Sequence, residues 1–268
     1  MWQRAVTMRS PFLSLCLCQL FMIYRVYSIS PGSLFQLFMI YRVYSISPPG
    51  SLFNLSTFDL QLPVAASGGG VEVIKSKDLV NGYSSQYFYT DPNDYSMVFF
   101  CPENGAHTSG STFPRSELRQ NPDFTLKAGG RHVLNVTIAV TETTAKKSIT
   151  IGQAHIDGIS GHCSIFVELE WTDGNVVSHL RDKNCGSVSE TVGIGYALGD
   201  KVTYSILIYG ATTIVSTDRG SMKPYTYSWL PVSTPVYFKA GNYLQDSGLN
   251  GKLGGTVKIY NISTSHLN

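Results

Sequence analysis

The sequence predicts an all-β protein, a sandwich or barrel of short strands, and three observations support this expectation. Aromatic residues make up 12% of the chain and it contains 25 glycines, a composition that favours sheets and turns. From about Ser56 onward, short β-rich runs alternate with turn clusters. Apolar residues spaced at the helical period of about 3.6 residues are almost absent from this region.

The expected strands are rich in Val, Ile, Thr, Tyr and Phe, and turn pairs such as Gly129-Gly130 separate them. They do not alternate with helical segments, and no glycine-rich phosphate-binding motif follows any of them, which argues against a nucleotide-binding fold. The expected strands cover residues 71–76, 84–90, 95–101, 132–143, 148–156, 164–172, 175–182, 201–210 and 256–265.

The start of the chain has the pattern of a secretory signal. Arg4 and Arg9 precede an apolar run of 14 residues, 11–24, which suits a signal core and is short for a membrane span of about 20 residues. We therefore expect a secreted, extracellular protein with no membrane segment in its mature form. Three N-glycosylation sequons permit this route and begin at Asn54, Asn135 and Asn261.

The signal-like segment also contains a tandem duplication. Residues 19–35 and 36–53 are nearly identical copies that differ by one inserted proline. Repeat architectures need several diverged copies, so this pair is not expected to build a fold. We assign residues 1–53 to a segment outside the fold and residues 54–268 to one folded domain.

The cysteine positions predict one disulfide bond. Asp173-Gly174 is a typical two-residue hairpin turn, and Cys163 and Cys185 lie almost equally far from it. They should therefore face each other, at the Cα separation of about 4.5–5.5 Å that opposed strand residues have. In a secreted protein this arrangement favours a disulfide over two buried thiols. Cys101 is expected to be a buried free thiol.

The segment Arg115-Ser116-Glu117-Leu118-Arg119 places three charged side chains on one face of a strand. Alternate residues point the same way, so Arg115, Glu117 and Arg119 share a face. Glu117 would hold both guanidinium groups and leave donors free for a substrate carboxylate. The alternative is a solvated row of surface ion pairs, which is common and contributes little to stability.

A second polar pair lies in Gln153-Ala154-His155. Gln153 and His155 share one strand face, and Ala154 points to the other. An amide beside an imidazole can bind a carboxylate and accept a proton. The alternative is a structural histidine, which is the commoner role of a lone histidine on a strand.

The third polar row lies in residues 237–245. Its Gly241 removes a side chain in mid-strand, where another group can approach closely. Tyrosines in sheets are usually packing residues, but here a lysine and a glutamine occupy the same face. The residues in this phase are Tyr237, Lys239, Gly241, Tyr243 and Gln245.

These residue types suit the β-elimination of a 4-linked uronate. This reaction removes the proton on C5, next to the carboxyl group, so the enzyme must neutralise the carboxylate, take the proton and protonate the departing oxygen. Arg115, Gln153 and His155 offer charge and hydrogen-bond donors for the carboxylate. Either Tyr243 or neutral His155 could serve as the base.

Glycoside hydrolysis is the weaker enzymatic alternative. It requires two carboxylates about 5–10 Å apart. The three polar segments contain only Glu117, which is expected to pair with the arginines. Glu168 and Glu170 share a strand face and are the candidate pair for this reaction.

Taken in order, RSELR, QAH and YFKAGNYLQ resemble the signature regions of the alginate lyases of polysaccharide lyase family 7. The family's usual forms are R-[ST]-E-[LV]-R, Q-[IV]-H and Y-F-K-x-G-x-Y-x-Q. With FDLQLPV at 58–64 and VKIYNISTSH at 257–266, the resemblance covers about Ser56 to His266. It implies a β-jelly-roll sandwich of two curved antiparallel sheets, of the concanavalin A-like lectin/glucanase type, with a concave groove and no metal or other cofactor.

The resemblance also implies roles for individual residues. Arg115, Gln153, His155 and Tyr243 match the family's catalytic set. The middle residue of its Q-x-H motif is usually Ile or Val and correlates with preference for guluronate or mannuronate. Ala154 departs from that pattern, which leaves mannuronate, guluronate and glucuronate open. The residues implied to bind substrate are Glu117, Arg119, Lys239 and Gln245.

The expected partner is an acidic polysaccharide, bound by a monomer. A net charge of +2 is too small to indicate a nucleic-acid partner. Besides an alginate lyase, two alternatives remain: a glucuronan lyase and a non-catalytic carbohydrate-binding jelly roll. The binding module would keep the groove but would not need His155 or Tyr243.

Overall fold

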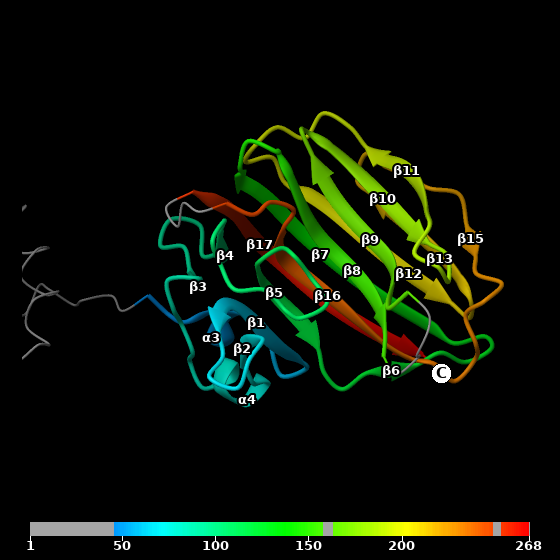
Figure 1. Ribbon diagram of the computed structural model, residues 1–268, viewed down its shortest axis with the longest axis horizontal. Helices are drawn as coiled ribbons and strands as arrows, with labels where there is room; N and C mark the ends of the chain where they lie inside the picture. The colour runs from blue at the N-terminus through cyan, green and yellow to red at the C-terminus, as the bar shows by residue number, and fades with distance from the viewer. Residues whose placement is uncertain (1–45, 158–162, 249–252, 268) are drawn as a thin grey trace, which may run out of the picture. The chain divides into compact units, whose positions relative to one another are not determined.

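The computed structural model describes residues 46–157, 163–248 and 253–267, which form two antiparallel sheets. In Figure 1 the sheets lie one behind the other, with their strands along the same diagonal. This is the predicted jelly-roll sandwich, so the predicted fold class is confirmed. The described part of the chain has no helix long and apolar enough to cross a membrane.

The first sheet carries all three polar segments. Its strands in spatial order are β11 (Ser187–Gly193), β10 (Asn175–Arg181), β9 (Ile165–Thr172), β8 (Ser148–Ile156), β16 (Pro235–Leu244), β5 (Arg115–Gln120), β1 (Phe58–Ala65) and β2 (Val71–Ile74), and β6 (Phe124–Thr125) pairs with β16.

The second sheet packs against the inner face of the first. Its strands in spatial order are β14 (Gly220–Ser221), β13 (Thr212–Thr217), β12 (Val202–Tyr209), β7 (Arg131–Glu142), β17 (Gly254–Leu267), β4 (Met97–Pro102) and β3 (Phe88–Thr90), and β15 (Tyr225–Thr226) pairs with β13.

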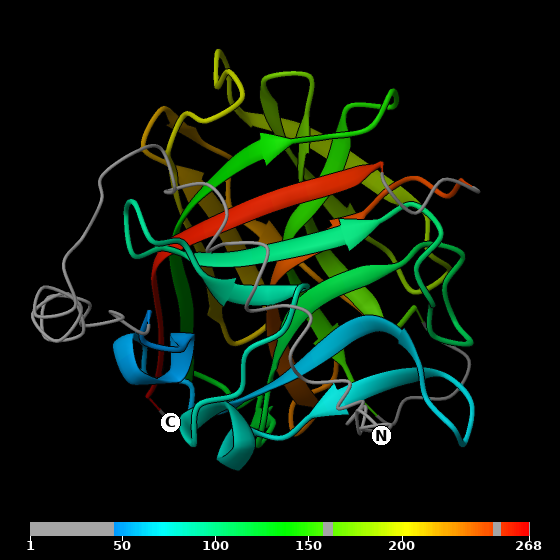
Figure 2. The same ribbon diagram turned by 90° about the vertical axis from the view of Figure 1, so that its left-hand side faces the viewer.

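Each run predicted to be a strand overlaps a strand of the structure. Strands β11 and β13 were not predicted, because SVSETVG and TTIVST are rich in Ser and Thr and carry few large apolar side chains. Two short helices, α3 (Pro49–Leu52) and α4 (Ser76–Val80), were not predicted either. Figure 2 shows both helices at the same end of the domain as β1 and β2.

The folded region begins before the predicted boundary at residue 54. Pro49 in α3 is buried, and Phe53 packs against the hydrophobic core. The last residues of the predicted outer segment therefore belong to the domain. The signal-like run, Cys16, Cys18 and most of the duplication lie outside the described residues.

Two buried polar side chains connect β16 and β8, which carry two of the polar segments, to the second sheet. Asn242 of β16 donates through Nδ2 to the carbonyl oxygens of Phe99, at 3.1 Å, and Gly255, at 2.7 Å. The hydroxyl of Tyr204, on β12, donates to the Ile151 carbonyl of β8 at 2.8 Å. A Cβ atom at Gly152 would lie only 2.5 Å from that hydroxyl. Gly152, one residue before Gln153, therefore leaves room for the Tyr204 hydroxyl, whose hydrogen bond to Ile151 holds β8 against the second sheet.

The predicted hairpin and its disulfide are both present. Asp173 and Gly174 have φ of 44° and 86°, as a two-residue turn of this kind requires. Cys163 and Cys185 form a disulfide with a Cα separation of 5.0 Å, which confirms the predicted pairing. Cys101 is a buried free thiol, also as predicted.

A pair of histidines lies between the sheets and contacts Gln120 and Phe238, which alternate with Arg119 and Lys239 and therefore point away from the polar face. Gln120 Nε2 donates to His266 Nε2 at 2.6 Å, and the Nδ1 atoms of His266 and His132 are 3.1 Å apart. The ring of Phe124 stacks on His132 at 4.3 Å. Burial lowers the pKa of His132 to about 4 and also lowers the pKa of His266. One proton shared between the Nδ1 atoms satisfies this contact, so the pair fits when both rings are neutral.

We expect the free energy of unfolding to fall as the pH drops from 6.5 toward about 4. In that window the unfolded histidine binds a proton and the folded His132 does not, so acid favours unfolding. His132 should contribute at most about 3 kcal/mol of this loss. Urea unfolding at both ends of the window measures it, and His132→Asn should show a smaller change. Equal changes in both proteins would contradict the assignment.

Candidate active site

The three polar segments lie side by side on one face of the first sheet. Directly opposed residues of antiparallel strands present their side chains to the same face. Lys239 of β16 lies opposite Arg119 of β5 on one side and Gln153 of β8 on the other. Tyr243 lies opposite Arg115. The strand order β8-β16-β5 therefore joins residues that are more than eighty positions apart in the sequence.

Gly241 makes this juxtaposition tight. Its φ of 145° is one that side-chain-bearing residues rarely adopt, and a Cβ atom there would lie 2.8 Å from the Ser116 carbonyl oxygen. The close approach predicted at Gly241 is therefore that of the β5 backbone. It keeps Lys239 and Tyr243 level with Glu117, which is opposite Gly241.

Glu117 is the centre of the cluster and is fully buried. Lys239 Nζ lies 2.5 Å from its Oε2, and Arg115 Nη1 lies 3.6 Å from the same atom. Burial lowers the pKa of Lys239 to about 8, so the lysine is largely charged at neutral pH. Two cations therefore surround one carboxylate, and this excess positive charge suits an anionic ligand.

Arg115 is almost buried and keeps donors uncommitted. Its side chain is 6% exposed, and its Cζ lies 4.0 Å from the centre of the Tyr243 ring. Its Nε has no hydrogen-bond partner among the described residues. A buried guanidinium with an unpartnered donor carries a desolvation cost, and a guanidinium is chemically able to bind a carboxylate.

His155 is buried and neutral. Burial, followed by repulsion from the neighbouring cations, lowers its pKa well below the ordinary value. Its Nε2 lies 2.8 Å from Gln153 Oε1, and its ring stacks on Tyr237 with centroids 5.1 Å apart. Arg119 lies over the Tyr237 ring at 3.8 Å. A neutral imidazole keeps a lone pair, so His155 can accept a proton.

The hydroxyl of Tyr243 contacts a loop residue that the sequence analysis missed. Ser111, in the loop between β4 and β5, has its Oγ 2.9 Å from Tyr243 Oη and 3.0 Å from the Phe113 carbonyl oxygen. A loop has no side-chain period that could have indicated this contact. The tyrosine and the loop enclose a pocket of about 400 Å³ lined by Ser109, Gly110, Ser111, Thr112, Phe113 and Tyr243.

Two of the predicted binding residues are less central than the rest. Arg119 Nη1 lies 2.6 Å from Asp123 Oδ1 and Nη2 lies 3.7 Å from Asp157 Oδ2, so aspartates balance its charge. Gln245 follows the end of β16 and donates to Thr150 Oγ1 at 2.9 Å. Within the described part of the chain, its side-chain hydrogen bonds go to Thr150 and to the Tyr243 carbonyl oxygen, and none reaches Glu117.

The two carboxylates considered for hydrolysis are engaged elsewhere. Glu168 pairs with Arg181 and accepts a hydrogen bond from Thr150 at 2.9 Å. Burial raises the pKa of Glu170, but hydrogen bonds led by that from His179 outweigh it, so the pKa is lowered overall. A hydrolase needs a carboxylic acid with a raised pKa. Glu170 therefore does not suit the role of general acid.

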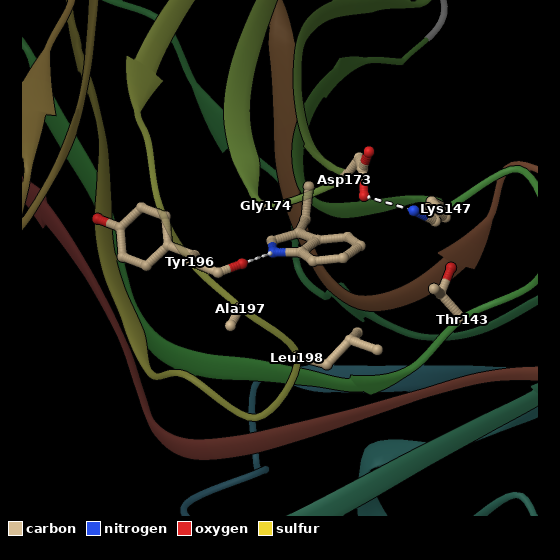
Figure 3. Close-up of a pocket in the computed structure, with 8 residues that line it drawn as sticks. Thr143, Lys147, Asp173, Gly174, Tyr196, Ala197 and Leu198 are labelled. Carbon is tan, nitrogen blue, oxygen red and sulfur yellow. Dashed lines mark hydrogen bonds and ion pairs between the residues drawn. The ribbon is translucent and has the colours of Figure 1, made fainter.

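A second pocket lies at one end of the sandwich, beside the Asp173-Gly174 turn (Figure 3). Its volume is about 190 Å³. Trp171 Nε1 donates to the Tyr196 carbonyl oxygen at 3.1 Å, and Lys147 pairs with Asp173 at 2.9 Å. Its charged groups neutralise each other, so this pocket does not offer the excess positive charge found around Glu117.

The fold and the polar face together define a class of protein. A jelly roll with an excess of positive charge, a neutral histidine and a tyrosine on one sheet face is equipped for proton transfer next to an anion. Glu170, one of the two carboxylates considered for hydrolysis, does not suit the role of general acid. These features are those of a polysaccharide lyase.

The comparison with known families is more specific. The family model described as alginate lyase matches residues 53–266. The chain belongs to this alginate lyase family.

Solved structures and a curated relative agree with this family. The chain is 30% identical to alginate lyase A1-II′ of polysaccharide lyase family 7, with a TM-score of 0.73 over 83% of this chain and 100% of that one. It is 28% identical to alginate lyase PA1167 from Pseudomonas aeruginosa, with a TM-score of 0.72 over 80% and 99%. A curated alginate lyase from Klebsiella pneumoniae is 42% identical over 74 residues, which span 27% of this chain and 24% of that protein.

Proposed function

We propose that this protein depolymerises alginate or a related polyuronate by β-elimination at a 4-linked uronate. One observation carries the proposal: Arg115 is nearly buried, has an unpartnered donor among the described residues, lies over the Tyr243 ring, and is one of the charges that lower the pKa of His155. A substrate carboxylate placed at the Arg115 guanidinium would be bound through its charge and its N–H donors. It would also bring its C5 proton near groups that can accept it.

The proposed roles follow from the charges and donors present. Arg115 and the second amide hydrogen of Gln153 bind the carboxylate and spread the negative charge that develops when the C5–H bond breaks. The proton passes to His155 or Tyr243. As the C4–O bond breaks, its electron pair leaves with the oxygen and Tyr243 protonates it. The electrons of the C5–H bond form the C4=C5 double bond, so the new non-reducing end is unsaturated.

Solved structures of a relative support an oligosaccharide of this class as the ligand. Structures of A1-II′ variants have been solved with a product (GGG) and with a substrate (GGMG). In the first a tyrosine is replaced, and in the second both a histidine and a tyrosine are replaced. Tyr243 and His155 are the tyrosine and histidine that we propose for proton transfer in this chain.

The preferred uronate is tested with polymannuronate, polyguluronate and glucuronan in separate incubations. Ala154, the position that departs from the family pattern, is fully buried and belongs to the hydrophobic core, so we expect it to have no direct contact with a sugar on the polar face. We expect ultraviolet absorbance from the conjugated double bond to rise with alginate-type polymers. A rise with glucuronan alone would make this a glucuronan lyase. Binding without any rise would establish the non-catalytic carbohydrate-binding alternative.

We also propose that the protein is secreted and acts as a monomer. The Cys163–Cys185 disulfide suits an oxidising compartment. The sequon asparagines Asn54, Asn135 and Asn261 are all exposed, as glycosylation requires. The proposed catalytic groups come from β5, β8 and β16 of one chain, so no second copy is needed to complete them.

A further inference from the structure

A chain of hydrogen bonds runs from Glu117 to His155 through Gln153. Gln153 Nε2 lies 2.5 Å from Glu117 Oε1, and Gln153 Oε1 lies 2.8 Å from His155 Nε2. Gln153 and Glu117 are fully buried, and His155 is 7% exposed. Water therefore has little access to these contacts, and the side chains must satisfy one another.

The chemistry of the groups fixes the direction of this chain. Glu117 pairs with Lys239 at 2.5 Å, so its carboxylate is ionised and can only accept hydrogen bonds. The Gln153 amide must therefore turn its NH₂ group toward Glu117. Its carbonyl oxygen then faces His155 and can only accept, so the imidazole must donate from Nε2.

We propose that Glu117, acting through Gln153, holds neutral His155 in its Nε2–H tautomer and so makes Nδ1 the one ring nitrogen able to accept a proton. The described residues offer Nδ1 no competing hydrogen-bond partner. Glu117 and Gln153 are then positioning residues for the ring. Their effect on catalysis rests on the proposed lyase function, but the tautomer itself does not.

Lys239 fixes the donor-to-acceptor direction of the hydrogen bonds between Glu117, Gln153 and His155, which we call the relay. The Lys239 side chain is 3% exposed, and its Nζ binds Glu117 Oε2, which leaves Oε1 for the Gln153 amide. A buried charge pair of this kind is weak evidence for stability, but it can specify one arrangement of the groups around it. Here the arrangement specified is the orientation of one amide and, through that amide, the tautomer of one histidine.

The direct test is nuclear magnetic resonance of the full protein with ¹⁵N-labelled histidine. The nitrogen that carries the proton and the nitrogen that carries the lone pair have well-separated ¹⁵N shifts and different couplings to the ring protons. The chain has six histidines, so the spectrum of His155→Gln identifies the signals of His155. We expect protonated Nε2 and unprotonated Nδ1 at neutral pH. Protonated Nδ1 in the wild-type protein would overturn the proposal.

The variant Glu117→Gln tests whether Glu117 determines the tautomer of His155. An amide at this position can donate or accept, so it no longer fixes the Gln153 amide. We expect both tautomers of His155 to appear and kcat to fall at least about tenfold, because a histidine held in the wrong tautomer can cost ~10⁴-fold. The matched control is Glu142→Gln, at the end of β7 in the other sheet, where the carboxylate accepts from Thr256.

Gln153→Leu provides a second route to the same test. It removes the acceptor at Nε2 and leaves the Lys239–Glu117 pair in place, so it does not depend on tolerance of Glu117→Gln. Retention of the single Nε2–H tautomer in a folded form of either variant would refute the relay. If the wild-type protein shows this tautomer but cleaves no polyuronate, the proposed function fails and the relay stands.

Discussion

Replacing Tyr243 with phenylalanine is expected to lower kcat by roughly 10²–10⁴-fold, the usual contribution of a positioned acid or base. The hydroxyl is the atom that we propose protonates the departing oxygen, and phenylalanine keeps the ring under Arg115. The side chain is only 8% exposed, so its packing should persist. The measurement is the rate of formation of the unsaturated product at saturating polymer, compared with the wild-type rate.

Tyr260→Phe is the matched control for this prediction. Tyr260 is on β17 in the second sheet, and its hydroxyl contacts Asp94 at 3.1 Å. The Tyr260→Phe variant also loses a tyrosine hydroxyl group, but outside the proposed site, so its kcat should match that of the wild-type protein. If Tyr243→Phe retained the wild-type rate, the proposed acid would be wrong, and equal losses in the two variants would point to a general effect on folding.

The strand period made most of the site predictable from the sequence. Residues two apart on a strand share a face, so Arg115 with Glu117 and Gln153 with His155 could be grouped without knowing which strands are neighbours. The structure adds that β16 lies between the two, so that Lys239 and Tyr243 complete the same cluster.

What the sequence could not predict depends on contacts between distant segments. Ser111 is in a loop, where side chains follow no period, and only the folded chain places it against Tyr243. The hydrogen bond from Gln153 to Glu117 spans 36 positions and depends on strand order. The expected pairing of Glu117 was also incomplete, because Lys239 lies closer to its carboxylate than Arg115 does.

The Glu117–Lys239 pair is difficult to explain by stability alone. Burying two charges removes them from water, and replacing such a pair with apolar side chains of similar size is often neutral or stabilising. Glu117 and Lys239 are 0% and 2% exposed, so they bear nearly the full desolvation penalty. We infer that the pair is present for the site: Lys239 contributes positive charge, and Glu117 orients Gln153.

Glu117→Leu is therefore expected to lower the free energy of unfolding by about 3–5 kcal/mol, because it leaves Lys239 buried without its partner. Adding Lys239→Met should restore part of that loss, since it removes the unpaired lysine charge, while Arg115 and the Gln153 amide still lack the carboxylate. Urea unfolding measures both effects, and product formation should remain strongly reduced in both variants. Recovery of stability without recovery of activity would establish a functional role for the pair. A double variant as unstable as Glu117→Leu would instead make the ion pair a structural requirement of the sheet.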